Sequence, residues 1–224
     1  MSYNVAIDGP AGAGKSTIAK QIAKRMGLIY VDTGAMYRAM ALYMIREKVD
    51  PKDPTAIVKK CEETHITIRY ENGEQVVLLN GENVNAFLRT EEVGNMASAI
   101  APRKEVRAKL VKLQRELAAT SDVIMDGRDI GTCVLPDADV KIYLTASSAV
   151  RAKRRYDELT AKGEECDLAK IEADIIERDE RDMTREESPL RQAEDAVLVD
   201  SSDMTIEEVI QAIIVICEKK REGN

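Results

Sequence analysis

The chain has 224 residues, 44% of them hydrophobic and 33% charged, which is ordinary for a soluble globular protein and long enough for one domain with a substantial core. Its 33 basic and 40 acidic residues give a net charge of −7, which argues against a nucleic-acid coat protein or a membrane-surface protein. No apolar run approaches the roughly 20 residues of a membrane span. We therefore expect neither a nucleic acid nor a membrane as partner.

The cysteines are far apart in the sequence, contain no C-x-x-C pair, and are accompanied by a single histidine, His65; they are Cys61, Cys133, Cys166 and Cys217. Zinc sites and disulfide frameworks depend on characteristic spacings, so this pattern predicts neither. It is typical of a protein of the reducing cytoplasm. We expect His65, which precedes a predicted strand, to be a solvated side chain.

The first motif is a glycine-rich loop. Residues 3–7 are a short β-branched run, residues 9–16 read G-P-A-G-A-G-K-S, and residues 15–26 have a helical pattern. The spacing G-x-x-x-x-G-K-[ST] is that of the phosphate-binding loop (P-loop), in which backbone N–H groups and Lys15 face phosphates and the Ser16 hydroxyl is placed to ligate Mg²⁺. A chance glycine-rich turn is the alternative, and the flanking strand and helix argue against it.

A second strand and helix follow the first pair. After Gly27, a helix stop, residues 28–31 predict a strand, Asp32-Thr-Gly34 a polar cap, and residues 35–48 a helix. This alternation predicts a parallel sheet with helices on both faces. In such sheets ligands collect beyond the carboxyl ends of the strands, where the P-loop and the cap would both lie.

Residues 50–100 interrupt this pattern. A turn cluster at 50–54 and a short helix precede three β-rich runs separated by turn signals, at 66–70, 75–79 and 83–85. The pattern predicts a small antiparallel sheet inserted into the α/β chain. An edge hairpin without a functional role is the alternative.

The alternating pattern then returns. Pro102 opens a helix to about residue 119, with an apolar stripe of Val106, Leu110, Leu113 and Leu117. Buried strands are predicted at 121–126, 138–144 and 196–199. Asp126 ends the first of these, as a P-loop fold requires for holding magnesium through water.

The last helix is opened by a capping box from Thr205 to Glu208. Its apolar positions recur at helical spacing and predict a buried face of Ile206, Val209, Ile210, Ile213, Ile214 and Cys217.

Residues 147–187 form a strongly charged helical stretch that Gly163 interrupts. Mixed charge on a helix is usually a solvated face, but two helical halves also fit a lid that folds over bound phosphates. Charge alone leaves both interpretations open.

Taken together, three motifs after the P-loop resemble the bacterial cytidylate kinases over essentially the whole chain: Asp32-Thr-Gly-Ala-Met-Tyr-Arg38, Asp126-Gly-Arg-Asp-Ile-Gly131 and Glu177-Arg-Asp-Glu-Arg-Asp182. The resemblance implies an α/β nucleoside-monophosphate-kinase fold, with a P-loop core whose parallel five-stranded sheet is flanked by helices, an inserted antiparallel subdomain and a helical lid. Within one kinase domain, 1–224, it implies a core of residues 1–62, 101–150 and 188–224, a monophosphate-binding insert of residues 63–100 and a lid of residues 151–187.

The resemblance also implies that ATP phosphorylates CMP, and dCMP, with the help of Mg²⁺. We further expect the protein to be cytoplasmic and monomeric. The resemblance assigns ATP to the P-loop and to two lid arginines, and the metal to Ser16; the ATP residues are Gly9, Pro10, Ala11, Gly12, Ala13, Gly14, Lys15, Ser16, Thr17, Arg154 and Arg155. It assigns the acceptor nucleotide to Thr33, Tyr37, Arg38, Ser98, Arg107, Arg128, Asp129, Arg178, Asp182 and Arg185. The expected catalytic residues are Lys15, Arg128, Arg178 and Arg185.

Within the acceptor set, the resemblance gives Arg38 and Arg128 the CMP phosphate and Asp182 the ribose hydroxyls, and Ser98, Arg107 and Asp129 the cytosine edge. Two positions depart from some relatives: Thr33 stands where they have Ser, and Ser16 where they have Gly.

The chemistry suits this set of residues. A nucleotide phosphate has a second pKa of about 6 and needs no strong general base, so positioning and charge stabilisation by arginines can carry the transfer. This favours the lid over a merely solvated face. A carboxylate at position 129 would accept from the amine of cytosine and oppose the carbonyl of uracil. For Asp129, a helix cap or an ion pair with Arg128 is the structural alternative.

Two other functions stay open. A P-loop kinase acting on another acceptor, such as UMP, AMP or a metabolite, would share most of these motifs. An NTP-driven switch would share the P-loop, but the arginine-rich lid and second anion pocket argue against it.

Overall fold

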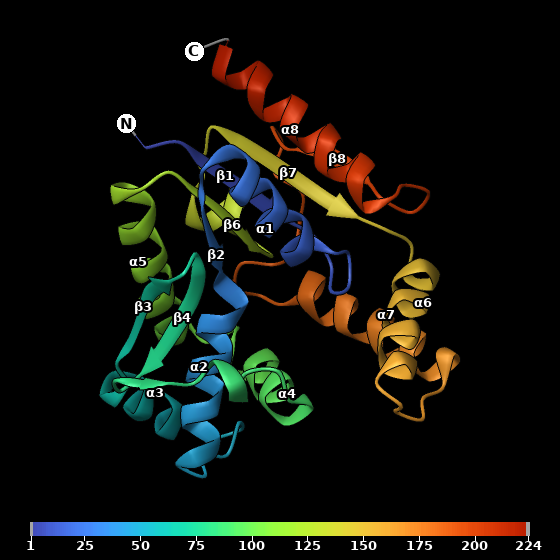
Figure 1. Ribbon diagram of the computed structural model, residues 1–224. Coiled ribbons are helices and arrows are strands. Elements are labelled where there is room, and N and C mark those ends of the chain that lie inside the picture. The colour runs from blue at the N-terminus through green and yellow to red at the C-terminus, as the bar shows by residue number, and fades with distance from the viewer. Residues whose placement is uncertain (1, 223–224) are drawn as a thin grey trace. The chain divides into compact units, whose positions relative to one another are not determined.

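The protein is described here by a computed structural model covering residues 2–222 (Figure 1). The described chain divides into two compact units, one formed by residues 2–30 and 122–222 and the other by residues 31–121. Among the described residues, no helix is both long enough and apolar enough to span a membrane. The four cysteines are free thiols. His65 is exposed, as the sequence predicts for that side chain.

The first unit is built on the predicted parallel sheet. Its five strands follow the order β2 (Ile29–Asp32), β6 (Val123–Gly127), β1 (Asn4–Asp8), β7 (Val140–Thr145) and β8 (Val197–Asp200). Strand β1 pairs in parallel with β6 and β7, and β7 pairs in parallel with β8. The fold-class prediction is confirmed. The boundary between the two units falls within β2.

Two helices cover one face of this sheet. Helix α1 (Lys15–Met26) and helix α8 (Ile206–Glu222) pack against each other, as Figure 1 shows. Their apolar stripes share one core cluster with the central strands, in which Ile7, Ile22, Ile142 and Ile213 are almost completely buried. This arrangement places the loop between β1 and α1 at the carboxyl edge of the sheet.

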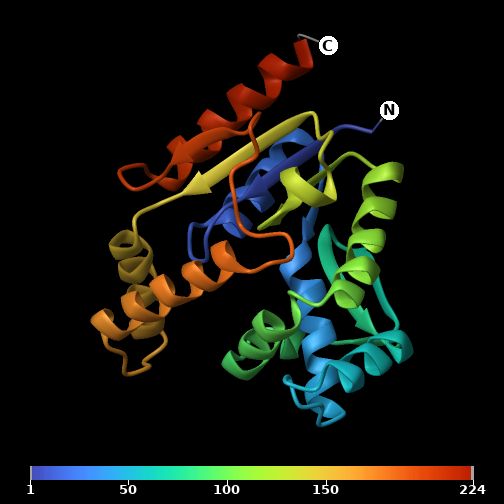
Figure 2. The same cartoon turned by 180° about the vertical axis from the view of Figure 1, so that it is seen from behind.

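The charged stretch forms a helical hairpin, as predicted. Helices α6 (Ser148–Ala161) and α7 (Leu168–Thr184) lie side by side, and the segment after α7 returns toward β8 (Figure 2). Gly163 lies just after α6 with a φ of 78°, which explains the interruption. Asp167 caps α7 by accepting from the backbone nitrogen of Lys170 at 2.9 Å.

The second unit contains the predicted antiparallel sheet. It is made of β3 (Ile66–Glu71), β4 (Glu74–Leu79) and β5 (Glu82–Asn83). Helix α2 (Thr33–Arg46) packs against β4 and against the other helices, which are α3 (Pro54–Glu63), α4 (Glu91–Ile100) and α5 (Lys104–Thr120). Methionines 36, 40 and 44 repeat at helical spacing and are fully buried. The single-turn η1 (Asn85–Phe87) joins β5 to α4.

Several sequence predictions were wrong in detail. Helix α2 begins at Thr33, because Asp32 caps it, and not at residue 35. Leu113 and Leu117 are half-buried, since the most buried line of α5 runs through Leu110, Gln114 and Ala118. Ile206 is 59% exposed, because periodicity assigns a face and not the presence of a packing partner at the helix end.

Two elements were not predicted. Helix α4 lacks a strong apolar run, although Thr90 caps it by accepting from Val93 at 3.3 Å. A π-helical turn, η2 (Ile130–Val134), follows β6 directly. Both carry or adjoin residues assigned to the acceptor nucleotide.

Candidate active site

The P-loop joins β1 to α1 and is shaped by its neighbours. A Cβ atom at Gly9 would lie 1.9 Å from the carbonyl oxygen of Leu144 in β7, so this position admits only glycine. Gly14 precedes α1 in a left-handed conformation and provides no side-chain cap. The first N–H groups of α1 are therefore not capped by a side chain at Gly14, as an anion site at a helix N-terminus requires.

Lys15 lies in the loop itself. Its Nζ atom donates to the carbonyl oxygens of Gly9 at 2.8 Å and Pro10 at 2.7 Å, and the residue is buried. Burial lowers the pKa of the Lys15 ammonium well below its ordinary value, and the nearby charge of Arg128 lowers that pKa further. A phosphate bound in the loop would offset both effects, so this lysine is suited to an anionic ligand.

Ser16 and Asp126 form the candidate metal site. The Ser16 hydroxyl donates to Asp126 Oδ2 at 2.8 Å, and the Tyr30 hydroxyl donates to Oδ1 at 2.9 Å. Asp126 lies near the end of β6, as predicted, whereas Tyr30 was not predicted. Magnesium prefers one or two carboxylates together with phosphate and water oxygens, so this oxygen pair fits it. The described residues contain no cluster of three or more metal-binding His, Cys, Asp or Glu side chains.

Two ion pairs join residues that the sequence assigns to the acceptor nucleotide. Arg128 Nε donates to Asp182 Oδ2 at 2.9 Å, and Arg185 Nη2 lies 3.5 Å from Asp129 Oδ1. Burial alone would raise the pKa of Asp182, but the charge of Arg128, helped by Arg178 and Arg185, holds it below its ordinary value. The structure thus brings together five of the residues assigned to the acceptor nucleotide.

Asp129 does not behave as a helix cap. It precedes η2, yet its side chain makes no capping hydrogen bond, and its ion-pair partner is Arg185. The loop is instead fixed by Asp8 at the end of β1, whose carboxylate accepts from the backbone nitrogens of Ile130 at 2.8 Å and Gly131 at 2.7 Å. Burial raises the pKa of Asp8 to about 6 against the opposing effect of these hydrogen bonds. Asp8 was not predicted, although a carboxylate ending a buried strand was the available signal.

The two lid arginines assigned to ATP contact other parts of the first unit in this structure. Arg154 donates to the carbonyl oxygen of Ser201 at 2.8 Å, and half-exposed Arg155 pairs with Glu158 at 3.0 Å. The arginine of α6 that contacts the P-loop is Arg151, which sequence reasoning did not single out; its Nη1 donates to the carbonyl oxygen of Ala11 at 2.9 Å. Contact of Arg154 and Arg155 with ATP stays a prediction.

In the second unit, the first two turns of α2 carry Thr33, Tyr37 and Arg38. Arg38 Nη1 lies 3.7 Å from Asp32, whose carboxylate also accepts from the backbone nitrogen of Ala35 at 2.9 Å. The guanidinium of buried Arg107 lies 5.9 Å from the Tyr37 ring centroid, a cation–π contact. Ser98 is half-buried on α4, which packs on α2.

Two contacts of this unit were not predicted. Exposed Arg89 also reaches Asp32, at 3.5 Å, and Gln75 of β4 exchanges two hydrogen bonds with the Asp32 backbone. Both come from the insert and hold the start of α2.

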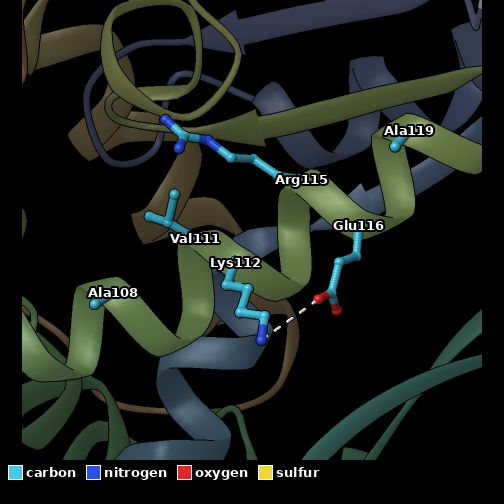
Figure 3. A pocket seen from close by; sticks show the side chains of 6 residues that line it. All are labelled: Ala108, Val111, Lys112, Arg115, Glu116 and Ala119. Atoms are coloured by element: carbon cyan, nitrogen blue, oxygen red, sulfur yellow. Dashed lines mark ion pairs between the residues drawn. The ribbon is translucent and has the colours of Figure 1, made fainter.

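A shallow hollow along α5 is unrelated to these residues. It has a volume of about 560 Å³ and is lined by one face of α5, where Lys112 and Glu116 face each other at 3.9 Å (Figure 3). The residues that line it are Ala108, Val111, Lys112, Arg115, Glu116 and Ala119, none of which the sequence assigns to a nucleotide.

The sequence is similar to known proteins over nearly its full length. The family model of the cytidylate kinases matches residues 5–219. The cytidylate kinase of Caldicellulosiruptor saccharolyticus is 52% identical over 211 residues, which cover 94% of this chain and 93% of the relative. That of Lactiplantibacillus plantarum is 50% identical over 223 residues, covering 100% and 98%.

Among solved structures, an uncharacterized protein from Eubacterium ventriosum shares the fold. Its TM-score is 0.52 at 12% identity, with 98% of this chain and 99% of that chain covered. The sequence motifs, the P-loop geometry and the two curated relatives agree, and we conclude that the chain belongs to the cytidylate kinase family.

Proposed function

We propose that this protein transfers the γ-phosphoryl group of ATP to CMP, giving ADP and CDP. Kinship at about half identity over nearly the full chain supports the reaction. In this protein's own structure, the proposed reaction is supported by an arginine–carboxylate network that lies in the same unit as the P-loop. The network consists of Arg128, Asp182, Arg185 and Asp129. An NTP-driven switch needs no such second group of anion-binding residues.

The P-loop residues bind the triphosphate. Uncapped N–H groups of α1 and the Lys15 ammonium face the β- and γ-phosphates, and the lysine exchanges its carbonyl partners for phosphate oxygens. Ser16 and Asp126 would hold Mg²⁺, which would neutralise charge on the phosphates.

The remaining assigned residues bind the acceptor nucleotide in this proposal. Arg38 and Arg128 bind the CMP phosphate, and planar guanidinium groups suit that task because they grip phosphate oxygens in pairs. Asp182, with its pKa held down by Arg128, stays ionised and accepts from ribose hydroxyls. Arg178 and Arg185 complete the positive surroundings of the transferred group.

Choice of base rests on Asp129. The carboxylate accepts from the exocyclic amine of cytosine, and Arg107 and Ser98 complete the recognition of the base edge. Uracil would place a carbonyl against that carboxylate, leaving buried polar groups unpaired. We extend the substrate class to dCMP, because no assigned contact depends solely on the 2′-hydroxyl.

The test is an acceptor panel. ADP release from ATP is measured with CMP, dCMP, UMP, AMP or no acceptor, at saturating Mg²⁺. We expect turnover with CMP and dCMP, and little with the others. ATP hydrolysis that is independent of every acceptor, and stimulated by a protein partner, would establish a switch instead.

A further inference from the structure

A buried ion pair connects the two helices of the α6–α7 hairpin. Arg151 Nη2 lies 2.6 Å from Asp179 Oδ2, and the two side chains are only 6% and 12% exposed. Removing two charges from water is costly, so a buried pair is weak evidence of a stabilising role. The position of the Arg151–Asp179 pair between the two helices and the P-loop points to a positioning role.

Arg151 also contacts the P-loop. Its Nε donates to the carbonyl oxygen of Ala146 at 2.8 Å, and its Nη1 donates to that of Ala11 at 2.9 Å. Its aliphatic stem lies against Gly12, where an added Cβ would be 3.4 Å from Arg151 Cβ. One guanidinium therefore joins the end of β7, the P-loop and α7.

Among the described residues, Arg151 is the ion-pair partner of Asp179, and no second hydrogen bond accounts for the burial of this carboxylate. Its Oδ1 atom is buried and lacks a hydrogen bond within the described part of the chain. Its contact with Arg151 is thus the interaction that fixes the guanidinium against Ala11. Without it, the arginine would keep its charge but lose one of the three groups that orient it.

The same helix carries an acceptor residue one turn further on. Asp182 follows Asp179 by three residues and pairs with Arg128, and Arg185 comes directly after α7. A continuous set of contacts therefore runs from the Ala11 carbonyl through Arg151 and Asp179 to the helix that presents Asp182.

We propose that Asp179 is a positioning residue that acts through Arg151 to couple the P-loop to α7, so that a nucleotide in the P-loop strengthens binding of the acceptor. This inference rests on the proposed function. Coupling of this kind is reciprocal and is measured as the ratio of acceptor dissociation constants with and without the donor analogue.

The experiment uses the full-length protein and isothermal titration calorimetry. CMP is titrated in the absence and presence of a non-hydrolysable ATP analogue with Mg²⁺. We expect the analogue to tighten CMP binding at least about fivefold in the wild type. In Asp179→Asn we expect a ratio at least about threefold smaller, while the dissociation constant of each nucleotide alone changes less than about twofold.

The matched control is Glu177→Gln. It removes the same charge from the same helix, but Glu177 is exposed and pairs at 3.7 Å with exposed Arg181. We expect it to keep the wild-type ratio. Arg151→Lys keeps the charge, but its three N–H donors lie on one nitrogen and cannot reach the three groups that Nε, Nη1 and Nη2 of Arg151 contact separately. It should therefore lose the coupling, and adding Asp179→Asn to it should cause no further loss.

A wild-type ratio preserved in Asp179→Asn would overturn the inference, even if that variant melts at a lower temperature, because a merely structural role lowers stability without altering the ratio.

A second experiment, hydrogen exchange, needs neither a variant nor CMP. Hydrogen exchange of the wild type with the ATP analogue alone should show slower exchange in residues 177–184, and an unchanged rate there would equally overturn it.

The two experiments distinguish a failure of the proposed function from a failure of the proposed coupling. If CMP neither binds nor accepts phosphate but the analogue protects α7, the proposed acceptor is wrong and the coupling of P-loop to α7 stands. If CMP is phosphorylated normally while the ratio is one, the coupling is wrong and the proposed function stands.

Discussion

The carboxylate of Asp8 and the backbone nitrogen of Gly131 are 2.7 Å apart, so the strand that leads into the P-loop also holds the loop after Asp129. The bond is made by a buried acid whose pKa is raised to about 6. This relationship has a consequence for stability as a function of pH.

Because the pKa of Asp8 is higher in the folded protein than its ordinary value of 3.8, the folded state binds the proton more tightly. Its contribution to the free energy of unfolding therefore increases as pH falls from about 7 toward 4. Asp8→Asn cannot titrate at this position, so the wild type should gain about 1.4 kcal/mol of stability relative to the variant between pH 8 and pH 5. Urea denaturation at both pH values measures it. A difference independent of pH would show that Asp8 titrates normally.

Lys15→Ala should reduce turnover far more than stability. The ammonium is used where charge develops on the transferred phosphoryl group, and we expect kcat to fall at least about 100-fold. The variant should keep a cooperative thermal transition, since the fold loses only two hydrogen bonds to loop carbonyls. Lys20→Ala, an exposed position of α1, is the control. Loss of the cooperative transition in Lys15→Ala would identify a structural lysine.

Asp129→Ala should lose the preference for CMP over UMP while still binding ATP. The ratio of kcat/KM for the two acceptors should fall by about tenfold or more, because the carboxylate no longer opposes the uracil carbonyl. Steady-state kinetics with both acceptors measure the ratio. A ratio equal to that of the wild type would mean that Asp129 serves only its ion pair with Arg185.

Ser16→Ala should raise the Mg²⁺ concentration needed for half-maximal activity. The variant loses the hydroxyl that lies 2.8 Å from Asp126 and leaves the backbone of the P-loop intact. Mg²⁺ titration of turnover at fixed ATP tests this, and chelation should abolish activity in both proteins without changing their melting temperature. An unchanged Mg²⁺ requirement would place the metal away from Ser16.

Gln114→Met should stabilise the protein. Gln114 is 1% exposed, and both atoms of its amide are buried without a hydrogen bond among the described residues. Replacing it with an apolar side chain of similar length removes that cost, which is on the order of 1 kcal/mol. Differential scanning calorimetry should show a higher melting temperature, whereas Gln21→Met on the exposed face of α1 should show none. A lower melting temperature would imply a water or polar partner at Gln114.

Most of the fold could be predicted from local sequence patterns. The P-loop, helix α1 with its Gly27 stop and the capping box from Thr205 to Glu208 each depend on residues close in sequence, and the structure has all three. Helix α4 was missed although its buried residues Val93, Ala97 and Ile100 recur at helical spacing and Thr90 caps it, because the segment is short and directly follows the β-rich runs.

The candidate site was predicted less completely. The resemblance supplied Arg128, Asp129, Asp182 and Arg185, but not which arginine pairs with which carboxylate. Arg151 and Asp8 lie 140 and 123 residues from their partners Ala11 and Gly131 along the chain. Contacts over such separations are set by the arrangement of the strands, so they cannot be predicted from a local sequence motif.

The crowding of Gly9 by Leu144 separates the glycines of the P-loop into two kinds. A library randomised at both ends of the loop and selected for soluble expression alone should still return glycine at position 9, where any side chain would meet the neighbouring strand. Position 14, which has a left-handed backbone but open space around it, should also admit asparagine. The fold thus requires glycine at the beginning of the phosphate loop before any nucleotide is bound, whereas at its end packing does not require glycine.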